Sequence, residues 1–594
     1  MVYIRPWING RTCAQRPCRK MLRRAQLKII YKARESRRNN PLPEGEDNVL
    51  ELLSNDWNDY GYETTFMTTC RIGGERIQLG AIKILFEKPN SRRYLKELLQ
   101  NGWDGSFPIP NESYISTPGE ITFYEQLVGA LSPKQAVKAA EALRDASYLI
   151  YVKDDASAQE MIQEGGFKDS LQRERGSIDA FNSGWKILDQ KSLAARDIDF
   201  SFKDVFGQRS SLKFKFGVGE TSLPRDINVL IGANGTGKSQ LLHQMVKAWL
   251  ADPRQVRSGD FAVPPDISRL IVVSYSPFEQ FPVDMEDSKL NDKEAYKYFG
   301  LRGVSKSSSP KRKLITLSRD IPRQDIVASL VSCVLDDQRF RHIQGWGRKI
   351  ATAERVLRAA IKFDAIALKL RSNINLKDLF EDLDELNKAV SVIKQGGKEA
   401  SFITITASNI RRIDAKMLER VVNADQGVLF LADGVIQQLS SGQRLFTYLV
   451  INVLGAIKRN TLILIGEPEL FLHPSLEIQL VDMLKQILES FNSRAVLATH
   501  SVSTVREIPA DCVHVLERTD DSLIIKQPPF QTFGGDFQRI ASYVFGDRAV
   551  SKPFERWIED QLEGMSAEEL IQSLGDDVNE ELIIQILAMG RDQW

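Results

Sequence analysis

The stretch Ile227-Asn-Val-Leu-Ile-Gly-Ala-Asn-Gly-Thr-Gly-Lys-Ser239 joins an apolar run, a glycine-rich turn and the start of a helix. The run up to Ile231 suits a buried strand, and the residues after Gly237 place apolar side chains on one helical face. The glycines let the backbone curl so that its N–H groups point at phosphate oxygens, near the positive end of the helix. The spacing predicts a phosphate-binding loop, and a glycine-rich turn without a ligand is the alternative.

Two side chains of this loop have defined expected roles. Lys238 is expected to reach the β and γ phosphates, and the Ser239 hydroxyl to hold Mg²⁺. The candidate nucleotide-binding residues of the loop are Asn234, Gly235, Thr236, Gly237, Lys238 and Ser239.

Composition limits the class of protein. The 594 residues predict three or four domains, and 42% hydrophobic with 26% charged residues is typical of a soluble globular protein. No apolar run is long enough to cross a bilayer, so we expect no membrane partner. The net charge is only +1, so nucleic-acid binding would have to come from local patches. Five scattered cysteines favour reduced thiols and a cytoplasmic protein.

The chain divides into six expected segments. Residues 1–48 are crowded with Lys and Arg and are expected to be a basic arm and linker, which contacts nucleic acid or is simply solvated. The others are an α+β accessory domain over 49–185, a lobe with the phosphate loop over 186–300, a basic loop and helical insertion over 301–425, a second lobe over 426–527, and a helical tail over 528–594 that docks a partner chain or packs on its own body.

The accessory domain has a predicted hairpin but no catalytic constellation. Its expected strands are Thr64–Cys70 and Ile77–Phe86, joined across Gly73 and Gly74. Glu120–Val128 and Pro133–Tyr151 are expected to be helices.

The insertion carries two patterns. Cations recur from Leu301 to Arg358, which suits a phosphate backbone as well as a solvated surface, so nucleic acid is a possible partner through 301–358. Six apolar residues then alternate at spacings of three and four, which predicts a short coiled-coil seam: Leu376, Leu379, Leu383, Leu386, Val390 and Ile393.

A second set of motifs lies in the C-terminal half. Leu439-Ser-Ser-Gly-Gln443 begins a helix, so Ser440 and the N–H of Gly442 are expected to bind a γ-phosphate. The strand Leu462–Ile465 precedes Gly466-Glu-Pro-Glu-Leu-Phe-Leu-His-Pro474, and the strand from Ala495 ends at His500. Gln280 follows another buried strand, Leu270–Ser274.

In this order the motifs resemble those of ATP-binding-cassette (ABC) ATPases, over roughly Asp197 to Gln527. The segment from Glu467 to Pro474 is most similar to the soluble branch that includes SMC, RecF and OLD proteins. The insertion and the extra N-terminal domain resemble bacterial anti-phage ATPases such as PtuA of Septu and Septu-like retron systems.

The resemblance implies an α/β fold, an ABC-type ATPase head with ATP and Mg²⁺ as cofactors. Two copies would sandwich ATP, so that the phosphate loop of one faces Ser440, Gly442 and Gln443 of the other. Glu467 would be the base that activates water, and His500 would contact the γ-phosphate. Gln280 would sense metal and γ-phosphate, so that the metal would depend on Ser239 and Gln280.

One position departs from the family pattern. The family normally has Asp immediately before the catalytic Glu, and this chain has Gly466. Either turnover is slow and the ATP-closed dimer is long-lived, or Glu467 and Glu469 share the missing function.

No nuclease motif follows Gln527, so we expect any cutting to be done by another chain. The sequence thus favours an ATPase that dimerises around ATP, or forms a higher oligomer, and regulates an effector nuclease in anti-phage defence. The alternatives are a DNA-repair or chromosome-type ATPase that clamps DNA, and an ATP-gated scaffold with little turnover.

Overall fold

The computed structural model forms two compact units, Met1–Phe533 and Gly534–Trp594. The residues that it describes are 27–33, 47–55, 61–88, 90–191, 193, 196–217, 222–251, 259–283, 292, 294–304, 315–371, 388–395, 398–546 and 553–591.

The first domain of the larger unit is built on a five-stranded sheet, in the order β1-β2-β3-β4-β5. β1 runs parallel to β2, and the other neighbours are antiparallel. β3 and β4 form the predicted hairpin across Gly73 and Gly74. The strands are β1 (Lys28–Lys32), β2 (Val49–Ser54), β3 (Thr65–Ile72), β4 (Glu75–Phe86) and β5 (Tyr114–Pro118).

β1 differs from the expected basic arm. Ile29 and Tyr31 are buried in the domain core, while Lys28 is exposed and Lys32 pairs with Glu51. The period-two pattern therefore adds an edge strand to the sheet, although the surrounding residues are basic. Residues 1–26 of the expected arm lie outside the described residues.

Helices cover this sheet, and one predicted helix is divided. The expected Pro133–Tyr151 helix ends at Ala142, because Arg144 adopts a left-handed φ of 50° and Asp145 caps a new short helix by accepting from the Tyr148 N–H. The helices are α1 (Ser91–Gln100), α2 (Thr122–Ala130), α3 (Pro133–Ala142), α4 (Ala146–Tyr148), α5 (Ala156–Met161) and α6 (Arg175–Leu188), with π-helical turns at Leu149–Lys153 and Phe167–Leu171.

A seven-stranded sheet forms the centre of the second domain, in the order β11-β10-β19-β20-β8-β21-β22. Every pairing is parallel except that of β21 with β22. Its inner strands are fully buried apolar runs, as expected for a parallel sheet covered on both faces. The strands are β8 (Ile227–Ile231), β10 (Arg269–Ser274), β11 (Tyr296–Gly300), β19 (Thr461–Gly466), β20 (Arg494–Thr499), β21 (Val513–Arg518) and β22 (Leu523–Lys526).

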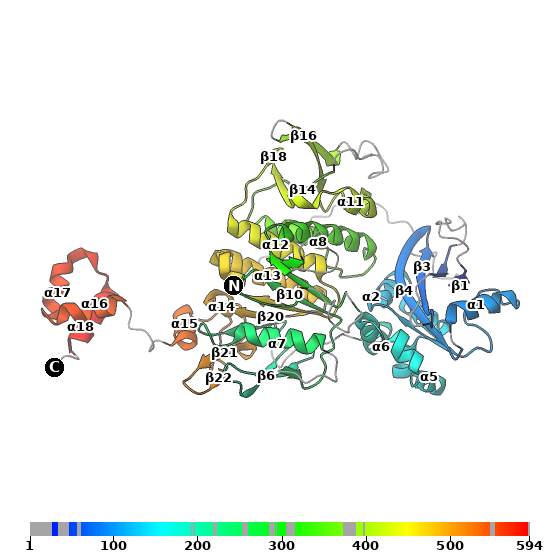
Figure 1. Ribbon diagram of the computed structural model, residues 1–594, viewed down its shortest axis with the longest axis horizontal. Coiled ribbons are helices and arrows are strands. Elements are labelled where there is room, and N and C mark those ends of the chain that lie inside the picture. The colour runs from blue at the N-terminus through cyan, green and yellow to red at the C-terminus, as the bar shows by residue number, and fades with distance from the viewer. Residues whose placement is uncertain are drawn as a thin grey trace, which may run out of the picture. The chain divides into compact units, whose positions relative to one another are not determined.

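Helices lie on both faces of the central sheet (Figure 1). α7 (Lys238–Leu250) covers one face, and α12 (Ser441–Ala456) and α13 (Pro474–Ser490) cover the other. A three-stranded sheet, β7-β6-β9, packs its phenylalanines against α7 and the central sheet. Its strands are β6 (Ile198–Lys203), β7 (Arg209–Phe214) and β9 (Gly259–Phe261), and the short α14 (Val502–Arg506) follows β20.

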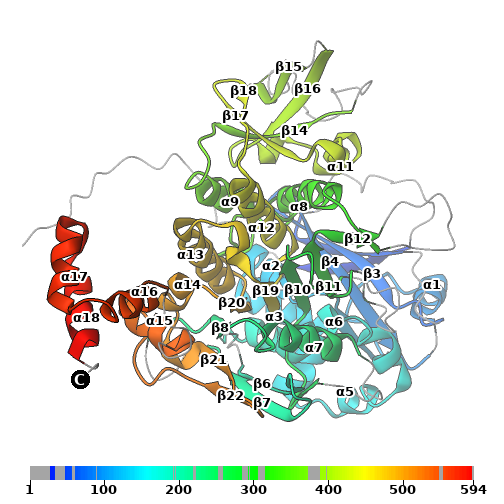
Figure 2. The same ribbon diagram turned by 60° about the vertical axis from the view of Figure 1, so that its left-hand side comes forward.

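The insertion is only partly helical. α8 (Asp320–Arg339) and α9 (Lys349–Leu357) pack beside α12, and beyond them lies a five-stranded sheet in the order β15-β16-β14-β17-β18 (Figure 2). The remaining elements are β12 (Arg302–Val304), β13 (Ile315–Leu317), β14 (Ala365–Lys369), β15 (Val390–Gln395), β16 (Lys398–Ile405), α11 (Ala415–Val421), β17 (Val428–Ala432) and β18 (Val435–Ile436).

The coiled-coil prediction is wrong at Val390 and Ile393. Both lie in β15, which pairs antiparallel with β16 from Val390 opposite Ile403 to Gln395 opposite Lys398. β-Branched residues favour a pleated strand once a partner strand is present, and helical spacing alone does not exclude this. The four leucines of the predicted seam lie outside the described residues.

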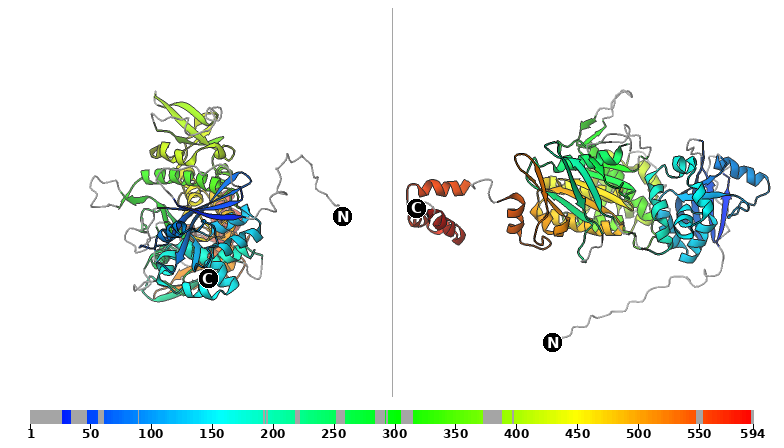
Figure 3. Two further views of the ribbon diagram at one scale, coloured as in Figure 1. Left: turned by 90° about the vertical axis from the view of Figure 1, so that its right-hand side faces the viewer. Right: turned by 90° about the horizontal axis from the view of Figure 1, so that it is seen from below.

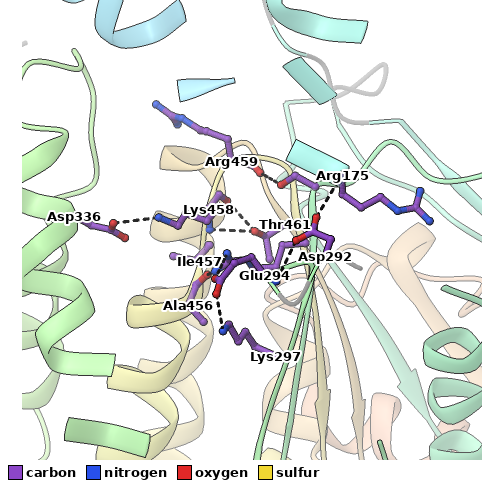
Figure 4. A network of polar contacts seen from close by, with 12 residues as sticks. Arg175, Asp292, Glu294, Lys297, Asp336, Ala456, Ile457, Lys458, Arg459 and Thr461 are labelled. Atoms are coloured by element: carbon purple, nitrogen blue, oxygen red, sulfur yellow. Dashed lines mark hydrogen bonds and ion pairs between the residues drawn. The ribbon is translucent and has the colours of Figure 1, made fainter. Parts of the chain in front are cut away.

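Polar contacts join the first domain to the second (Figure 4). The Arg175 N–H donates to Asp292 at 2.9 Å, and the Arg459 guanidinium pairs with Glu125 at 2.9 Å. Asn460 also donates to the buried Asp179 at 2.6 Å. Since Arg459 and Asn460 directly precede β19, the first domain contacts the end of the sheet opposite the phosphate loop.

The smaller unit contains four helices among its described residues: α15 (Phe537–Phe545), α16 (Pro553–Leu562), α17 (Ala567–Leu574) and α18 (Glu580–Arg591). Ile558, Leu570 and Ile586 are buried together in one cluster. α16, α17 and α18 contact one another, and these helices lie together in Figure 3. The apolar faces of this tail therefore pack on one another.

None of the described helices has the length and apolar character needed to cross a membrane. Among the described residues, Cys70, Cys333 and Cys512 are buried and free.

Candidate functional site

Strand register brings the predicted motifs to one edge of the central sheet. Ile231 pairs with Thr499, and Ala498 pairs with Gly466. Gly466 in turn pairs with Ser274 on its other side. Four parallel strands therefore end together, with the phosphate loop, Glu467, His500 and the loop containing Gln280 as their direct continuations. Such an edge is where open α/β sheets bind ligands.

The phosphate loop requires glycine at its close approaches. A Cβ on Gly232 would lie 2.1 Å from the carbonyl oxygen of Leu516 in β21. Gly237 begins α7 with a left-handed φ of 89°, and its Cβ would lie 2.9 Å from Val205. The Thr236 hydroxyl donates to the Ala233 carbonyl at 3.0 Å and closes the turn. The close approaches therefore favour glycine at both positions, and the Thr236 hydrogen bond joins the two sides of the turn.

Lys238 is buried beneath this loop. Its ammonium donates to the carbonyls of Gly232 and Ala233 at 3.0 and 3.1 Å. Burial lowers the pKa of Lys238 to about 8, although the carboxylates of Glu467 and Glu469 act in the opposite direction. A phosphate would supply the anionic partner that this cation lacks within the loop.

The other predicted loop residues differ in exposure. Asn234 and Gly235 are exposed at the tip, whereas Thr236 is buried. Ser239 is half-buried in the first turn of α7, directly after Lys238. The loop therefore presents its tip outward and keeps Lys238 and Ser239 at the helix N-terminus.

Glu467 lies directly after β19 in a backbone conformation that is rare for a residue with a side chain. Its φ is 49°, and its N–H donates to the Ala498 carbonyl at 2.8 Å. Burial raises the pKa of the Glu467 carboxyl, and the charges of Glu279 and Glu469 add to this, while Lys238 opposes it. A raised carboxyl pKa and local backbone strain are both features of catalytic bases.

The Glu469 carboxylate accepts hydrogen bonds from the end of β20 and the residue after it. Its carboxylate accepts from the Thr499 hydroxyl at 2.8 Å and from the backbone N–H of His500. Glu469 therefore braces the end of β20, and this argues against its sharing the function of the missing aspartate.

His500 lies beside the phosphate loop. Burial lowers the pKa of its imidazole, the charge of Lys238 lowers it further, and a hydrogen bond with the Gly232 backbone acts in the opposite direction. His500 is therefore expected to be neutral near pH 7, and its single ring N–H would donate to a phosphate oxygen in place of the Gly232 backbone.

The Leu439–Gln443 segment differs from the phosphate loop because its helix begins with a side-chain capping box. Ser440 caps α12, because its hydroxyl accepts from the Gln443 N–H at 3.2 Å and the Gln443 amide oxygen accepts from the Ser440 N–H at 3.0 Å. The Gln443 amide also donates to the Ala360 carbonyl at 2.7 Å. A Cβ on Gly442 would lie 2.6 Å from the Phe471 carbonyl oxygen. Ser440 is exposed, so the capped helix end faces outward.

Sequence reasoning named Gln280 and missed the residue before it. Gln280 is exposed, whereas Glu279 is half-buried and its carboxylate lies over Gly466. The only sign of Glu279 in the sequence was its position directly before Gln280. Its relevance depends on the pairing of Ser274 with Gly466, which brings the loop after β10 beside the end of β19.

The residues at this edge fit a magnesium ion held mainly by phosphates and water. Among the described residues, there is no group of three or more His, Cys, Asp or Glu side chains that could hold a metal alone. One oxygen of Glu279, Oε1, is nevertheless buried without a hydrogen-bond partner. Mg²⁺ keeps several waters and uses few protein ligands, so the Ser239 hydroxyl and one carboxylate are a suitable set.

A basic cleft of about 1250 Å³ lies between the first domain and the insertion. Arg339 from α8 and Arg411 line it, and Arg341 lines it while pairing with Glu75 at 3.2 Å. Part of the predicted 301–358 surface thus faces a cleft. Lys349 does not, because it is fully buried and bonded to Asp336 at 2.7 Å. Residues 305–314 lie outside the described residues.

Comparison with known proteins gives relatives but no family. No family model matches the chain. Protein ea59 of Escherichia phage lambda is 22% identical over 572 residues, which is 93% of this chain and 97% of that protein. The similarity extends over nearly the whole of both chains, and the name of the relative states no activity.

Three solved structures are similar to part of this chain. UvrA2 from Deinococcus radiodurans is 14% identical over 55% of this chain, which spans 36% of UvrA2, with a TM-score of 0.24. The SMC head domain from Thermotoga maritima is 10% identical, covering 57% of this chain and 100% of that one, with a TM-score of 0.23.

A third structure, an SmcHead bound to the C-winged helix domain of ScpA, is 11% identical and covers 57% of this chain and 98% of that one, with a TM-score of 0.24. These similarities concern fold alone and carry no argument about activity. The functional conclusion therefore depends on the residues at the sheet edge.

Proposed function

We propose that this chain is a cytosolic ABC-type ATPase that dimerises around ATP and thereby regulates a partner chain. The observation that carries the proposal is the meeting of the phosphate loop, Glu467 and His500 at one edge of a parallel sheet. The capped N-terminus of α12 supplies a second phosphate-binding element that faces outward.

Each residue at the sheet edge has a role in this proposal. The backbone of the phosphate loop and Lys238 bind the β and γ phosphates, and Ser239 contributes to Mg²⁺, which neutralises phosphate charge. Glu467 accepts a proton from the attacking water, and His500 donates a hydrogen bond to the γ-phosphate.

Dimerisation follows from the separate position of the Leu439–Gln443 segment. The hydrogen bonds of Ser440 and Gln443 among the described residues stay within the α12 end or go to Ala360, and none reaches the phosphate loop of the same chain. A second copy would place this exposed helix end against the γ-phosphate, where backbone N–H groups and the helix dipole stabilise negative charge.

The test is ATP turnover and ATP-dependent association of the purified chain, with Glu467→Gln as the diagnostic variant. The variant should bind ATP, hydrolyse it at less than about a hundredth of the normal rate, and accumulate as a dimer, because the base is lost while the phosphate contacts remain. Light scattering measures the dimer, and single-turnover hydrolysis measures the rate. A variant with normal turnover would refute the role of Glu467.

The partner in this proposal is an effector nuclease in anti-phage defence. The support is the resemblance of the insertion and the extra N-terminal domain to PtuA-type ATPases. The purified chain should leave DNA and RNA intact with any divalent metal. Cleavage by a preparation free of other proteins would overturn the partner model.

A second candidate function is direct clamping of DNA, and the basic cleft favours it. Arg339 and Arg411 face a space large enough for a phosphate backbone. Arg339→Glu with Arg411→Glu should weaken salt-sensitive DNA binding by at least about tenfold, because two phosphate contacts become repulsions. Arg93→Glu is the matched control, since Arg93 is exposed on α1 outside the cleft. Equal DNA binding by all three proteins would remove this candidate.

A further inference from the structure

We propose that Glu279 supplies the carboxylate that this site lacks at Gly466, and that it orients the magnesium ion of bound ATP from the loop after β10. The proposal rests on the ATPase function above and adds a metal-orienting residue to it. It also explains why glycine can stand at the end of β19.

The geometry places the Glu279 carboxylate where a side chain at 466 would otherwise be. A Cβ built on Gly466 would lie 2.9 Å from Glu279 Oε2, 3.2 Å from Oε1 and 3.4 Å from Cδ. The volume above this strand end is therefore already filled by a carboxylate. The acid reaches the site from β10, which is the neighbouring strand, instead of from β19.

Two contacts hold the Glu279 loop in place. The Ser274 hydroxyl donates to Glu279 Oε2. The Arg302 guanidinium donates to the backbone carbonyls of Glu279 and Phe281 at 3.4 and 3.3 Å, and Phe281 is buried in the core. One carboxylate oxygen is thus oriented by Ser274 while the loop backbone is tied to β12.

The other oxygen has no partner. Glu279 Oε1 is buried and accepts no hydrogen bond, which is costly for a carboxylate oxygen unless a ligand satisfies it. A magnesium-bound water is a donor of the required kind, and carboxylates in this position orient metals through such waters. The charge of Glu279 also acts on Glu467, the proposed base.

This assignment changes the expected effect of restoring aspartate. The family pattern alone would suggest that Gly466→Asp raises turnover, because it returns the missing acid. In this structure the new side chain would meet the Glu279 carboxylate at contact distance, so two negative charges would compete for one place. Gly466→Asp should therefore weaken metal binding when Glu279 is present.

The experiment measures metal affinity directly. Mn²⁺ is titrated by electron paramagnetic resonance into the full chain saturated with a non-hydrolysable ATP analogue, and analogue affinity without metal is measured separately. Glu279→Gln should weaken Mn²⁺ by about tenfold, the usual effect of losing an orienting carboxylate, with little change in metal-free analogue affinity. Gln has the same shape, so Ser274 can still donate to its amide oxygen. The control is Glu294→Gln, at the other end of the β10–β11 pair, and it should have no effect.

A carboxylate exchange completes the test. Gly466→Asp combined with Glu279→Ala should recover Mn²⁺ affinity to within about threefold of the original protein, whereas Gly466→Asp alone should not. Equal Mn²⁺ affinity for Glu279→Gln and the original chain would overturn the assignment of Glu279. Higher affinity in Gly466→Asp alone would do the same. If the original chain binds neither analogue nor Mn²⁺, the ATPase proposal fails, and this inference fails with it.

Discussion

The phosphate loop and the Leu439–Gln443 segment are both helix N-termini, but they differ in what their polar groups already bind. Lys238 is buried under its loop with two carbonyl contacts and no anionic partner in the loop. Ser440 is exposed, and its hydroxyl already accepts a hydrogen bond from the Gln443 N–H of its own helix. We therefore expect the first element to bind phosphate by itself, and the second to contact phosphate only when another surface brings one to it. The difference predicts that nucleotide binding and head engagement can be separated by mutation.

The largest expected effect is on the phosphate loop. Lys238→Ala should weaken ATP binding by at least about a hundredfold, because it removes the cation that offsets the β and γ phosphate charge. Equilibrium binding of a labelled ATP analogue measures the loss. Affinity equal to that of the original chain would show that this loop is not the nucleotide site.

Ser440→Arg should leave ATP affinity within about twofold while abolishing ATP-dependent dimerisation, because a bulky side chain would block the opposing γ-phosphate. Ser440→Asp is the matched control for folding, since aspartate is also a good helix cap. It should keep the stability of the chain and still prevent engagement, because its charge repels the phosphate. Light scattering with and without ATP distinguishes these outcomes. Normal dimerisation by both variants would refute the sandwich.

Gly442→Ala tests the packing under the second element. Its Cβ would lie 2.6 Å from the Phe471 carbonyl oxygen, so the free energy of unfolding should fall by about 1–3 kcal/mol. Gly165→Ala is the control, because its Cβ would lie 3.8 Å from the nearest atom, an Asp169 carboxylate oxygen. Thermal unfolding monitored by circular dichroism compares the two. Equal stability would mean that α12 moves freely relative to Phe471.

The smallest expected effect is a pH dependence of ATP affinity. The pKa of Lys238 is about 8 without ligand, and bound phosphate should raise it, so binding takes up a proton at alkaline pH. ATP affinity should therefore fall by about tenfold between pH 7 and pH 9, with free Lys238 protonated below this range and neutral above it. Calorimetry in buffers of different ionisation enthalpy measures the proton uptake. The absence of uptake at pH 9 would show that Lys238 keeps its proton without nucleotide.

Local motifs were predictable because their chemistry is confined to a few consecutive residues. The glycines of the phosphate loop, the capped end of α12 and the apolar strands that precede Glu467 and His500 all follow from short-range spacing. Their common edge comes from the pairing of β10, β19, β20 and β8, which aligns the carboxyl ends of these parallel strands. The roles of all the candidate site residues stay predictions, including metal binding by Gln280 and nucleotide binding by Gln443.

Features that depend on partners distant in sequence were not predictable. The sequence around Lys28–Lys32 predicts a basic arm, but in the structure this segment is a strand paired with β2. The spacing at Val390 and Ile393 predicts a helix, but Val390–Gln395 is a strand paired with β16. In each case the same side chains satisfy two local patterns, and long-range hydrogen bonding selects one of them.

The sequence by itself predicted the phosphate loop, a base at Glu467, the position of His500 and the missing aspartate at Gly466, because each depends only on residues that are close along the chain. Only the tertiary structure decided what occupies the place of that aspartate. The register of β10 with β19 sets Ser274 beside Gly466 and brings the Glu279 carboxylate over it. Glu279 and Gly466, which are far apart along the chain, thus meet at one strand end. Strand pairing is a long-range interaction whose register depends on the whole buried face of a sheet, so no local pattern could have revealed this contact.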